Sequence, residues 1–197
     1  MPPIAHPLVT PTAYLTQERA SSGKSEFVNG RIYAMAGASR PHNLIVGNTF
    51  AEIRAQLRGR GCEAYVNDMR VKVARTDLYT YPDIAALCGE PQFEDEHVDT
   101  LLNPSVIIEV LSPSTESYDR GAKFAHYRRM DSLQEYVLVS QDTPQVEHYR
   151  RTGDSWVLTE LSDLDAELSL ASLDCNLALR DMYDGVPFPP DTSAPRD

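Results

Sequence analysis

Two acidic residues, one inside an apolar segment and one at the start of another, are the first candidates for chemistry. Glu109 lies within residues 106–111, where every neighbour is apolar, and Asp83 follows Pro82 and opens the apolar segment 84–88. A lone ionised carboxylate in such surroundings is costly, so something must compensate its charge. A bound cation and a set of hydrogen bonds are two ways to do so. The simplest alternative is a strand-end carboxylate paired with a neighbouring Arg or Lys.

The chemistry open to these two acids depends on whether their segments are neighbouring strands. If they are, the carboxylates of Asp83 and Glu109 converge on one cation. Mg²⁺ takes one or two carboxylates and completes its shell with water and substrate phosphate. Such a site could activate water and neutralise a leaving phosphate, as phosphodiester hydrolysis requires. Taken alone, Pro82-Asp83 is weak evidence for a metal ligand, because both residue types also favour turns.

A lysine and a further acid are the next candidates. Lys123 comes four residues after Asp119 and four before Tyr127, so the three side chains share a helix face. A Lys beside a metal-bound water can orient the nucleophile or stabilise negative charge. The alternative is a solvated Asp119–Lys123 pair. Glu26 precedes the Asn29-Gly30 turn, and the local sequence by itself predicts only that Glu26 is a surface residue of a strand.

The sequence pattern around these residues predicts a mixed sheet covered by helices, which must position them. Asn29-Gly30 between apolar segments predicts a hairpin, because both turn positions need a positive φ. Ser39 before Pro41 predicts a helix start, and Gly59 ends that helix. We expect strands at 26–28, 31–33, 62–66, 69–73, 83–88, 106–111 and 135–140, a hairpin of 146–150 with 156–161, and helices at 12–19, 119–130 and 177–183.

Composition predicts one domain and raises an objection to DNA binding. A chain of 197 residues that is 42% hydrophobic can bury one core, which we place at residues 12–186 between flexible arms at 1–11 and 187–197. The formal net charge is -11, whereas contacts to DNA phosphates need Lys and Arg. No apolar stretch is long enough to cross a membrane, so we expect a cytoplasmic protein.

The three cysteines favour neither a disulfide framework nor a zinc site. Cys62, Cys88 and Cys175 are odd in number and widely spaced, and the chain has no C-x-x-C motif. Cys62 and Cys88 lie among apolar residues, which predicts small buried hydrophobic side chains at both positions.

Several of these segments together match a known family. They are Ser-Glu-Phe-Val-Asn-Gly-Arg at 25–31, Tyr-Pro-Asp-Ile at 81–84, Ile-Glu-Val-Leu-Ser-Pro-Ser-Thr at 108–115, then Asp119, Lys123 and Tyr127, and Glu-Tyr-Val-Leu-Val at 135–139. With this combination the chain resembles the Uma family of endonuclease-like proteins, within the PD-(D/E)XK restriction-endonuclease-like superfamily. The resemblance runs from about residue 12 to residue 186.

The resemblance implies a fold, a metal and a substrate. The fold is an α/β (α+β) restriction-endonuclease-like core, with a central mixed sheet flanked by helices. The site is a strand pair that carries Asp83 and Glu109 as ligands of Mg²⁺, or of Mn²⁺ in its place, and the substrate is DNA. Glu26 resembles the accessory acid that the superfamily often has near its N-terminus.

The same resemblance leaves the catalytic lysine open. The superfamily pattern expects Lys two residues after the Glu, and this chain has Leu111 there. Lys123 on the following helix is nominated in its place, and Lys72 is the fallback. His42 falls where relatives often carry His near a helix start. Its role stays open, and a hydrogen bond at the helix end is the simpler interpretation.

DNA binding by an acidic chain would need a local basic cleft. Two groups of basic residues are candidates to meet near Asp83 and Glu109, although each could be an ordinary solvated face. The first group is Arg54, Arg58, Arg60, Arg70, Lys72 and Arg75, and the second is Arg120, Lys123, Arg128 and Arg129.

Three hypotheses for function follow. The first is a metal-dependent DNA endonuclease in which Asp83 and Glu109 hold the ion, Lys123 polarises water or phosphate, and Glu26 assists. The second is a catalytically inactive nuclease-fold scaffold that binds DNA or a protein partner, favoured by Leu111 and the acidic composition. The third is a carboxylate-metal hydrolase for a small phosphoester or RNA. By analogy with nucleases that cut two strands, we expect a homodimer.

Overall fold

A central six-stranded sheet organises the chain in the computed structural model, which describes residues 8–188. The strand order is β11-β10-β9-β8-β6-β3, and only the β8–β9 pair is parallel. The strands are β3 (Cys62–Val66), β6 (Ile84–Cys88), β8 (Val106–Leu111), β9 (Glu135–Ser140), β10 (Val146–Thr152) and β11 (Ser155–Leu161).

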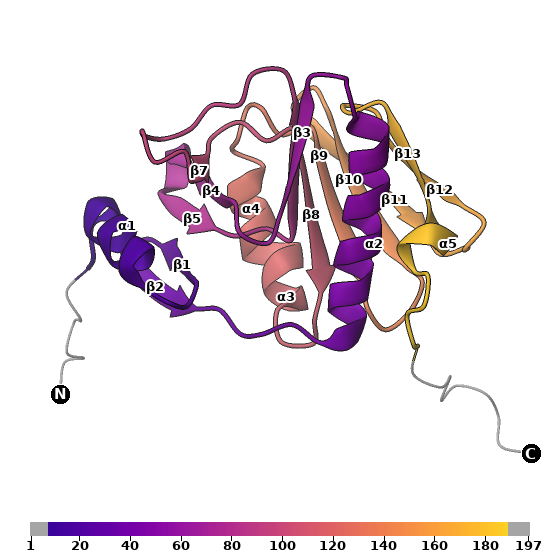
Figure 1. Cartoon of the computed structure of the whole chain (residues 1–197), viewed down its shortest axis with the longest axis horizontal. Coiled ribbons are helices and arrows are strands. Elements are labelled where there is room, and N and C mark those ends of the chain that lie inside the picture. Colours follow the sequence, from indigo (N-terminus) through magenta and orange to yellow (C-terminus); the bar gives the residue numbers. More distant parts are fainter. Residues whose placement is uncertain (1–7, 189–197) are drawn as a thin grey trace, which may run out of the picture.

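Two smaller sheets complete the β structure. A five-stranded sheet has the order β2-β1-β5-β4-β7, and a hairpin of β12 and β13 forms the third sheet. The strands are β1 (Ser25–Val28), β2 (Arg31–Ala34), β4 (Arg70–Val73), β5 (Leu78–Thr80), β7 (Thr100–Leu101), β12 (Glu167–Leu170) and β13 (Cys175–Ala178). In Figure 1 the β1–β2 hairpin and helix α2 lie on opposite sides of the end of β8.

The helices are mostly short. They are α1 (Pro11–Ala20), α2 (Arg40–Leu57), the 3₁₀ turn η1 (Ala74–Thr76), α3 (Glu116–Tyr118), the π-helical turn η2 (Asp119–Lys123), α4 (Phe124–Tyr127) and α5 (Leu179–Met182). Helix α2 begins as expected, because the Ser39 hydroxyl accepts a hydrogen bond from the His42 backbone N–H. The predicted β1–β2 turn is also confirmed, with Asn29 and Gly30 both at positive φ.

Strand β8 is buried along its whole length and divides the core into two clusters. Its even-numbered residues pack toward α2, β12, β13 and α5, whereas Ile107 and Leu111 pack toward α4, β4 and β5. Glu109 shares the second face, because alternate strand residues point the same way. The prediction of a central strand buried on both faces is therefore confirmed, together with the mixed sheet flanked by helices.

Several boundaries differ from the expected ones. The helix expected at 119–130 is built from α3, η2 and α4 and ends at Tyr127. The last helix begins only at Leu179, because Leu177 belongs to β13. Strand β5 and the β12–β13 hairpin were not expected from the sequence. Of the expected arms, residues 1–7 and 189–197 lie outside the described residues, whereas the Val9 backbone N–H donates to the Gly30 carbonyl.

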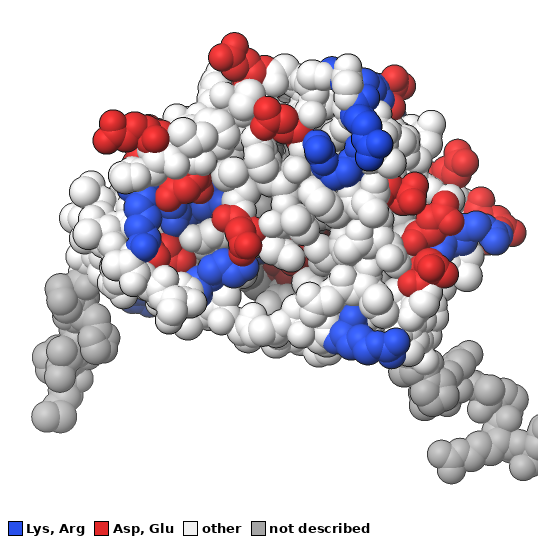
Figure 2. Space-filling view, in the orientation of Figure 1, with Lys and Arg blue, Asp and Glu red and all other residues white. Residues whose placement is uncertain are grey.

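The surface is hollowed between the β1–β2 hairpin and the beginning of α2, above the segment that joins them (Figure 2). Acidic atoms are visible on the floor of this hollow, and acidic and basic side chains are interspersed over the rest of this face. Within residues 8–188, no helix has both the length and the apolar character to cross a membrane.

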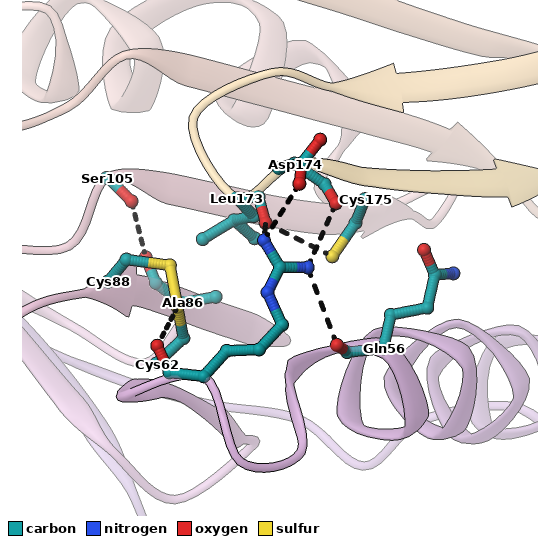
Figure 3. Close-up of a disulfide and its surroundings, with 9 residues drawn as sticks. Gln56, Cys62, Ala86, Cys88, Ser105, Leu173, Asp174 and Cys175 are labelled. Carbon is teal, nitrogen blue, oxygen red and sulfur yellow. Dashed lines mark hydrogen bonds and ion pairs between the residues drawn. A yellow bond between two sulfur atoms is a disulfide. The ribbon is translucent and has the colours of Figure 1, made fainter.

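Cys62 and Cys88 form a disulfide, so the expectation of two buried reduced cysteines is wrong (Figure 3). The cause is strand register: β3 and β6 are antiparallel, and Cys62 lies directly opposite Cys88 at a Cα–Cα distance of 4.0 Å. Cys88 is exposed and Cys62 is half-buried, whereas Cys175 is a free buried thiol. The bond joins the edge strand β3 to the strand that follows Asp83.

Candidate active site

Asp83 and Glu109 come together as neighbours in the central sheet. Strands β6 and β8 pair antiparallel with Ile84 opposite Ile108, so the same register places Asp83 beside Glu109. Side chains directly opposite each other point to the same face of a sheet. The expectation that these two acids lie on adjacent strands is therefore met.

Asp83 is held by contacts from strand β8 and from helix α2. Its Oδ2 atom accepts a hydrogen bond of 2.7 Å from the Val110 backbone N–H and lies 3.2 Å from His42 Nε2. His42 reaches it from the first turn of α2, so the simpler expectation of a helix-end hydrogen bond for the His42 side chain is not met. The side chains of Asp83 and His42 are 17% and 13% exposed, so solvent reaches this part of the site.

Glu109 is buried against a lysine and a tyrosine from the η2–α4 helix. Its Oε1 atom lies 2.9 Å from Lys123 Nζ and accepts a hydrogen bond of 3.0 Å from the Tyr127 hydroxyl. Glu109 is 4% exposed, Lys123 5% and Tyr127 0%. The predicted helix face is thus confirmed, because Lys123 and Tyr127 both reach the same carboxylate oxygen.

Two further acids surround the same ammonium group. Lys123 Nζ lies 3.2 Å from Glu26 Oε1 and 3.4 Å from Asp119 Oδ1. Glu26 is only 8% exposed and accepts a hydrogen bond from the Thr80 hydroxyl, so its interpretation as a surface strand residue is wrong. The reason is that β1 is not an outer strand: it pairs with β2 on one side and with β5 on the other.

Burial and the neighbouring charges shift the pKa values of the acids and of the lysine at this site. It raises the pKa of Glu109 to about 8, a rise that the Lys123 ammonium opposes and that the charges of Asp119 and Asp83 reinforce. Burial also raises the pKa of Asp119. For Lys123, burial acts to lower the pKa, but the surrounding carboxylates, Glu109 first, raise it well above its ordinary value. The lysine is therefore the fixed positive charge of the site.

The acids of the site outnumber its bases. Asp83, Glu109, Glu26 and Asp119 face one ammonium group and one imidazole. Within residues 8–188, neither Asp83 Oδ1 nor Glu109 Oε2 receives a hydrogen bond, so each carboxylate keeps an oxygen for another ligand. One or two carboxylate oxygens are the protein share that Mg²⁺ uses, and the described residues hold no cluster of three or more ligating side chains. Two carboxylate oxygens are donors of the kind that a hard divalent cation takes when water completes its shell.

The position where the superfamily pattern has a lysine is occupied by an apolar residue. Leu111 points to the same face as Glu109, two residues along β8, and packs in the apolar cluster on that face. The ammonium group comes instead from Lys123, at the end of the π-helical turn. Turns of this kind often occur at functional sites. Lys72, the fallback, lies 2.6 Å from Glu94 Oε1 and is engaged there.

The two basic groups do not surround the carboxylates. Among the described residues, Lys123 is the only one of them that pairs with an acid of the site. Arg70 is buried and binds Asp99, Thr100 and Tyr81. Ion pairs hold three other members elsewhere: Arg60 with Asp174, Arg75 with Asp131, and Arg120 with Glu116 and Glu147.

Two neighbours of the site were not found from the sequence. Thr80 lies on the unexpected strand β5 and donates to Glu26. The Tyr118 ring centroid is 5.9 Å from Lys123 Nζ. Burial raises the pKa of the Tyr118 hydroxyl. The only signal for either residue was its closeness in sequence, Thr80 to Asp83 and Tyr118 to Asp119.

Comparisons with known proteins identify the family of this chain. A family described as "Uma2: Putative restriction endonuclease" matches residues 11–180. Two proteins of Synechocystis sp. are similar over most of their length. "Uncharacterized protein sll1609" is 39% identical over 83% of this chain and 93% of its own, and "Uncharacterized protein slr1290" is 33% identical over 95% and 97%.

A solved structure shares the fold. It is the crystal structure of "a putative nuclease belonging to DUF820" from Anabaena variabilis, with a TM-score of 0.72 and 20% sequence identity. The likeness covers 89% of this chain and 97% of that one.

Proposed function

Because the chain belongs to the Uma2 family of restriction-endonuclease-like proteins, we propose that it is a Mg²⁺-dependent endonuclease that hydrolyses phosphodiester bonds of DNA. The observation that carries the proposal is the excess of acids around one lysine. Asp83, Glu109, Glu26 and Asp119 gather at a site where Lys123 and His42 are the cationic candidates. Such an excess is stabilised when a divalent cation binds.

Asp83 and Glu109 are the residues that would hold the metal. Bound there, Mg²⁺ supplies a more acidic water and neutralises charge on the phosphate. The chain prepares the two ligands from opposite sides: the Val110 N–H and His42 orient Asp83, and Tyr127 and Lys123 orient Glu109. Each set of contacts occupies one oxygen, which leaves the other to face the ion.

Lys123 would act on the phosphate and on the nucleophile. Its ammonium group stays charged, so it can stabilise negative charge that develops on a phosphate oxygen or orient the attacking water. Glu26 and Asp119 hold the same group from two further directions and limit its rotation. Glu26 is therefore a positioning residue for Lys123.

The test is nicking of supercoiled plasmid by the purified full-length protein with Mg²⁺ and, separately, with Mn²⁺. Asp83→Asn and Glu109→Gln should each abolish nicking while circular dichroism shows an intact fold. Asp142→Asn is the matched control, because Asp142 is an exposed loop acid. Wild-type protein that cleaves nothing with either metal, or an Asp83→Asn protein that cleaves normally, contradicts the proposal.

A non-catalytic nuclease-fold scaffold is the second candidate. The observation that favours it is that Glu109 already has a cation and a hydrogen-bond donor of its own, at 2.9 Å and 3.0 Å. Calorimetric unfolding separates the two candidates. A scaffold gains no stability from Mg²⁺, and its Asp83→Asn variant responds to Mg²⁺ as the wild type does. A metal-dependent nuclease is stabilised by Mg²⁺ only when Asp83 is present.

The proposal includes one domain at residues 12–186, a homodimer and a cytoplasmic location. A second copy would supply a second site for the opposite DNA strand, and the edge strand β11 exposes Val157 and Leu158, which a copy could cover. Sedimentation of the wild type and of Leu158→Lys tests the dimer.

The Cys62–Cys88 bond argues against the cytoplasmic location, because reducing compartments seldom keep disulfides. Cell fractionation decides where the protein lies.

A further inference from the structure

A polar cavity lies outside the candidate active site. Its volume is about 340 Å³, and it opens between the turn of the β1–β2 hairpin, the 3₁₀ turn η1 and helix α4. The residues that line it are Asn29, Arg75, Thr76, Ala125, His126 and Arg129. Arg75 belongs to the first basic group of the sequence and Arg129 to the second, so the two groups meet here rather than at the carboxylates.

The lining groups are suited to bind an anion. Two guanidinium groups, an imidazole, an amide and a hydroxyl can all donate hydrogen bonds, and none of the described residues that line the cavity is acidic. Arg129 pairs with no acid among residues 8–188. Arg75 pairs with Asp131 at 2.9 Å, but both side chains are largely exposed, and such pairs are weak.

His126 lacks a partner in this setting. Its ring Nδ1 atom is buried and has no hydrogen bond to any described residue. Burial, and then the positive charge of Arg129, hold the pKa of His126 below its ordinary value. An anion in the cavity would screen the guanidinium charge of Arg129, which is one of the two causes that lower the pKa of His126.

The cavity and the candidate active site are built from the same two elements. Strand β1 contributes Glu26 to the site, and the turn after it contributes Asn29 to the cavity. The η2–α4 segment contributes Lys123 to the site and His126 to the cavity. Three strand residues span roughly 10 Å, a distance short enough for one DNA strand to contact both places.

We infer that this cavity binds a phosphate of the DNA backbone near the phosphate that is cleaved, on the same strand. The inference rests on the proposed function, because it needs a nucleic-acid strand to lie across the carboxylate site. The pocket would hold the strand by charge and hydrogen bonds to phosphate, without reading its sequence. It also answers the objection from net charge, since an acidic protein needs only a local group of donors along the strand.

The experiment measures binding of a short fluorescein-labelled DNA duplex by fluorescence anisotropy, with full-length protein in EDTA, over a series of salt concentrations. Arg75→Ala and Arg129→Ala should each weaken binding roughly fivefold and lower the salt slope by about one. Asp131→Asn should tighten binding, because it removes the competitor for Arg75. Arg58→Ala is the matched control: Arg58 is an exposed arginine at the C-terminal end of α2, and it should change neither quantity.

Inorganic phosphate is the second probe, and isothermal titration calorimetry measures its binding. The duplex should bind far more tightly than phosphate, because several phosphates are contacted at once. Wild-type protein that does not bind the duplex, or Arg75→Ala and Arg129→Ala proteins that bind like Arg58→Ala, overturns the inference. Phosphate binding that the two variants abolish, with duplex binding unchanged, overturns the assignment to DNA.

This experiment contains no metal and no cleavage, so it separates the two claims. Duplex binding that depends on Arg75 and Arg129, in a protein that nicks no plasmid, supports the pocket and contradicts only the proposed catalysis. Nicking that depends on Asp83, with binding that ignores both arginines, contradicts only the pocket.

Discussion

Lys123 Nζ lies 2.9 Å from Glu109 Oε1, although the lysine comes from a helix and the glutamate from the central strand. In the superfamily pattern the lysine follows the glutamate on the strand itself, and here that place is taken by the buried Leu111. The same charge is therefore brought to the same carboxylate by a different element.

Metal-free wild-type protein should lose stability as the pH rises from about 5 to 8. Glu109 has a pKa of about 8 in the folded chain, which lies above its ordinary value of 4.5, so the native state holds a proton that the unfolded state has released over this range. Stability falls with pH wherever the native state binds more protons. The loss should be on the order of a few kcal/mol in urea unfolding with EDTA.

Glu109→Gln provides the comparison for that titration. The amide cannot ionise, so the unfolding free energy of this variant should change much less between pH 5 and 8. Parallel pH profiles for the wild type and Glu109→Gln would show that Glu109 is already ionised in the native protein at neutral pH.

Lys123→Met should lower the rate of plasmid nicking by about 10²-fold or more, since it removes the charge that faces the phosphate. Lys72→Met is the matched control, because Lys72 pairs with Glu94 and contacts no acid of the site. Circular dichroism of both proteins checks folding. Equal loss in the two variants would mean that Lys123 has no special role.

A lysine moved from the helix to strand β8 tests whether the ammonium group can act from either element. The double variant Leu111→Lys with Lys123→Met puts an ammonium group two residues after Glu109, on the same face of β8. Its nicking rate should exceed that of Lys123→Met alone. If the double variant folds and is no faster, then the ammonium group must approach from the helix side.

Reduction of Cys62–Cys88 should destabilise the protein by about 2–4 kcal/mol, because the bond closes a loop across 26 residues of sequence. Urea unfolding with and without dithiothreitol measures the difference, and Cys88→Ser should be insensitive to the reductant. Wild-type protein whose unfolding curve is unchanged by dithiothreitol, after mass spectrometry has confirmed reduction, would contradict a stabilising role for the bond.

The sequence predicted elements better than it predicted how they pair. The strand that carries Glu109 and the strand that follows Asp83 were both expected, because apolar residues mark them clearly. The pairing of β3 with β6 was not expected, and it alone brings Cys62 opposite Cys88. Contacts between strands depend on topology, which the local pattern of one strand does not contain.

The burial of Glu26 and the positions of the arginines also depend on contacts that the local sequence does not contain. Glu26 was interpreted as a surface residue because its hairpin was visible in the sequence, whereas the third strand beside it, β5, was not. Arg70 and Arg75 lie close in sequence, yet Arg70 is buried against Asp99 and Arg75 lines a cavity with Arg129. Side chains of one strand or turn point in different directions, so closeness in sequence does not make a basic surface.

Mg²⁺ binding to metal-free protein, measured by isothermal titration calorimetry at pH 8, tests the central claim most directly. The wild type should bind Mg²⁺, Asp83→Asn and Glu109→Gln should each lose that binding, and Asp142→Asn should keep it. Wild-type protein that binds no Mg²⁺, or that binds it equally well without the carboxylates of Asp83 and Glu109, would contradict the account.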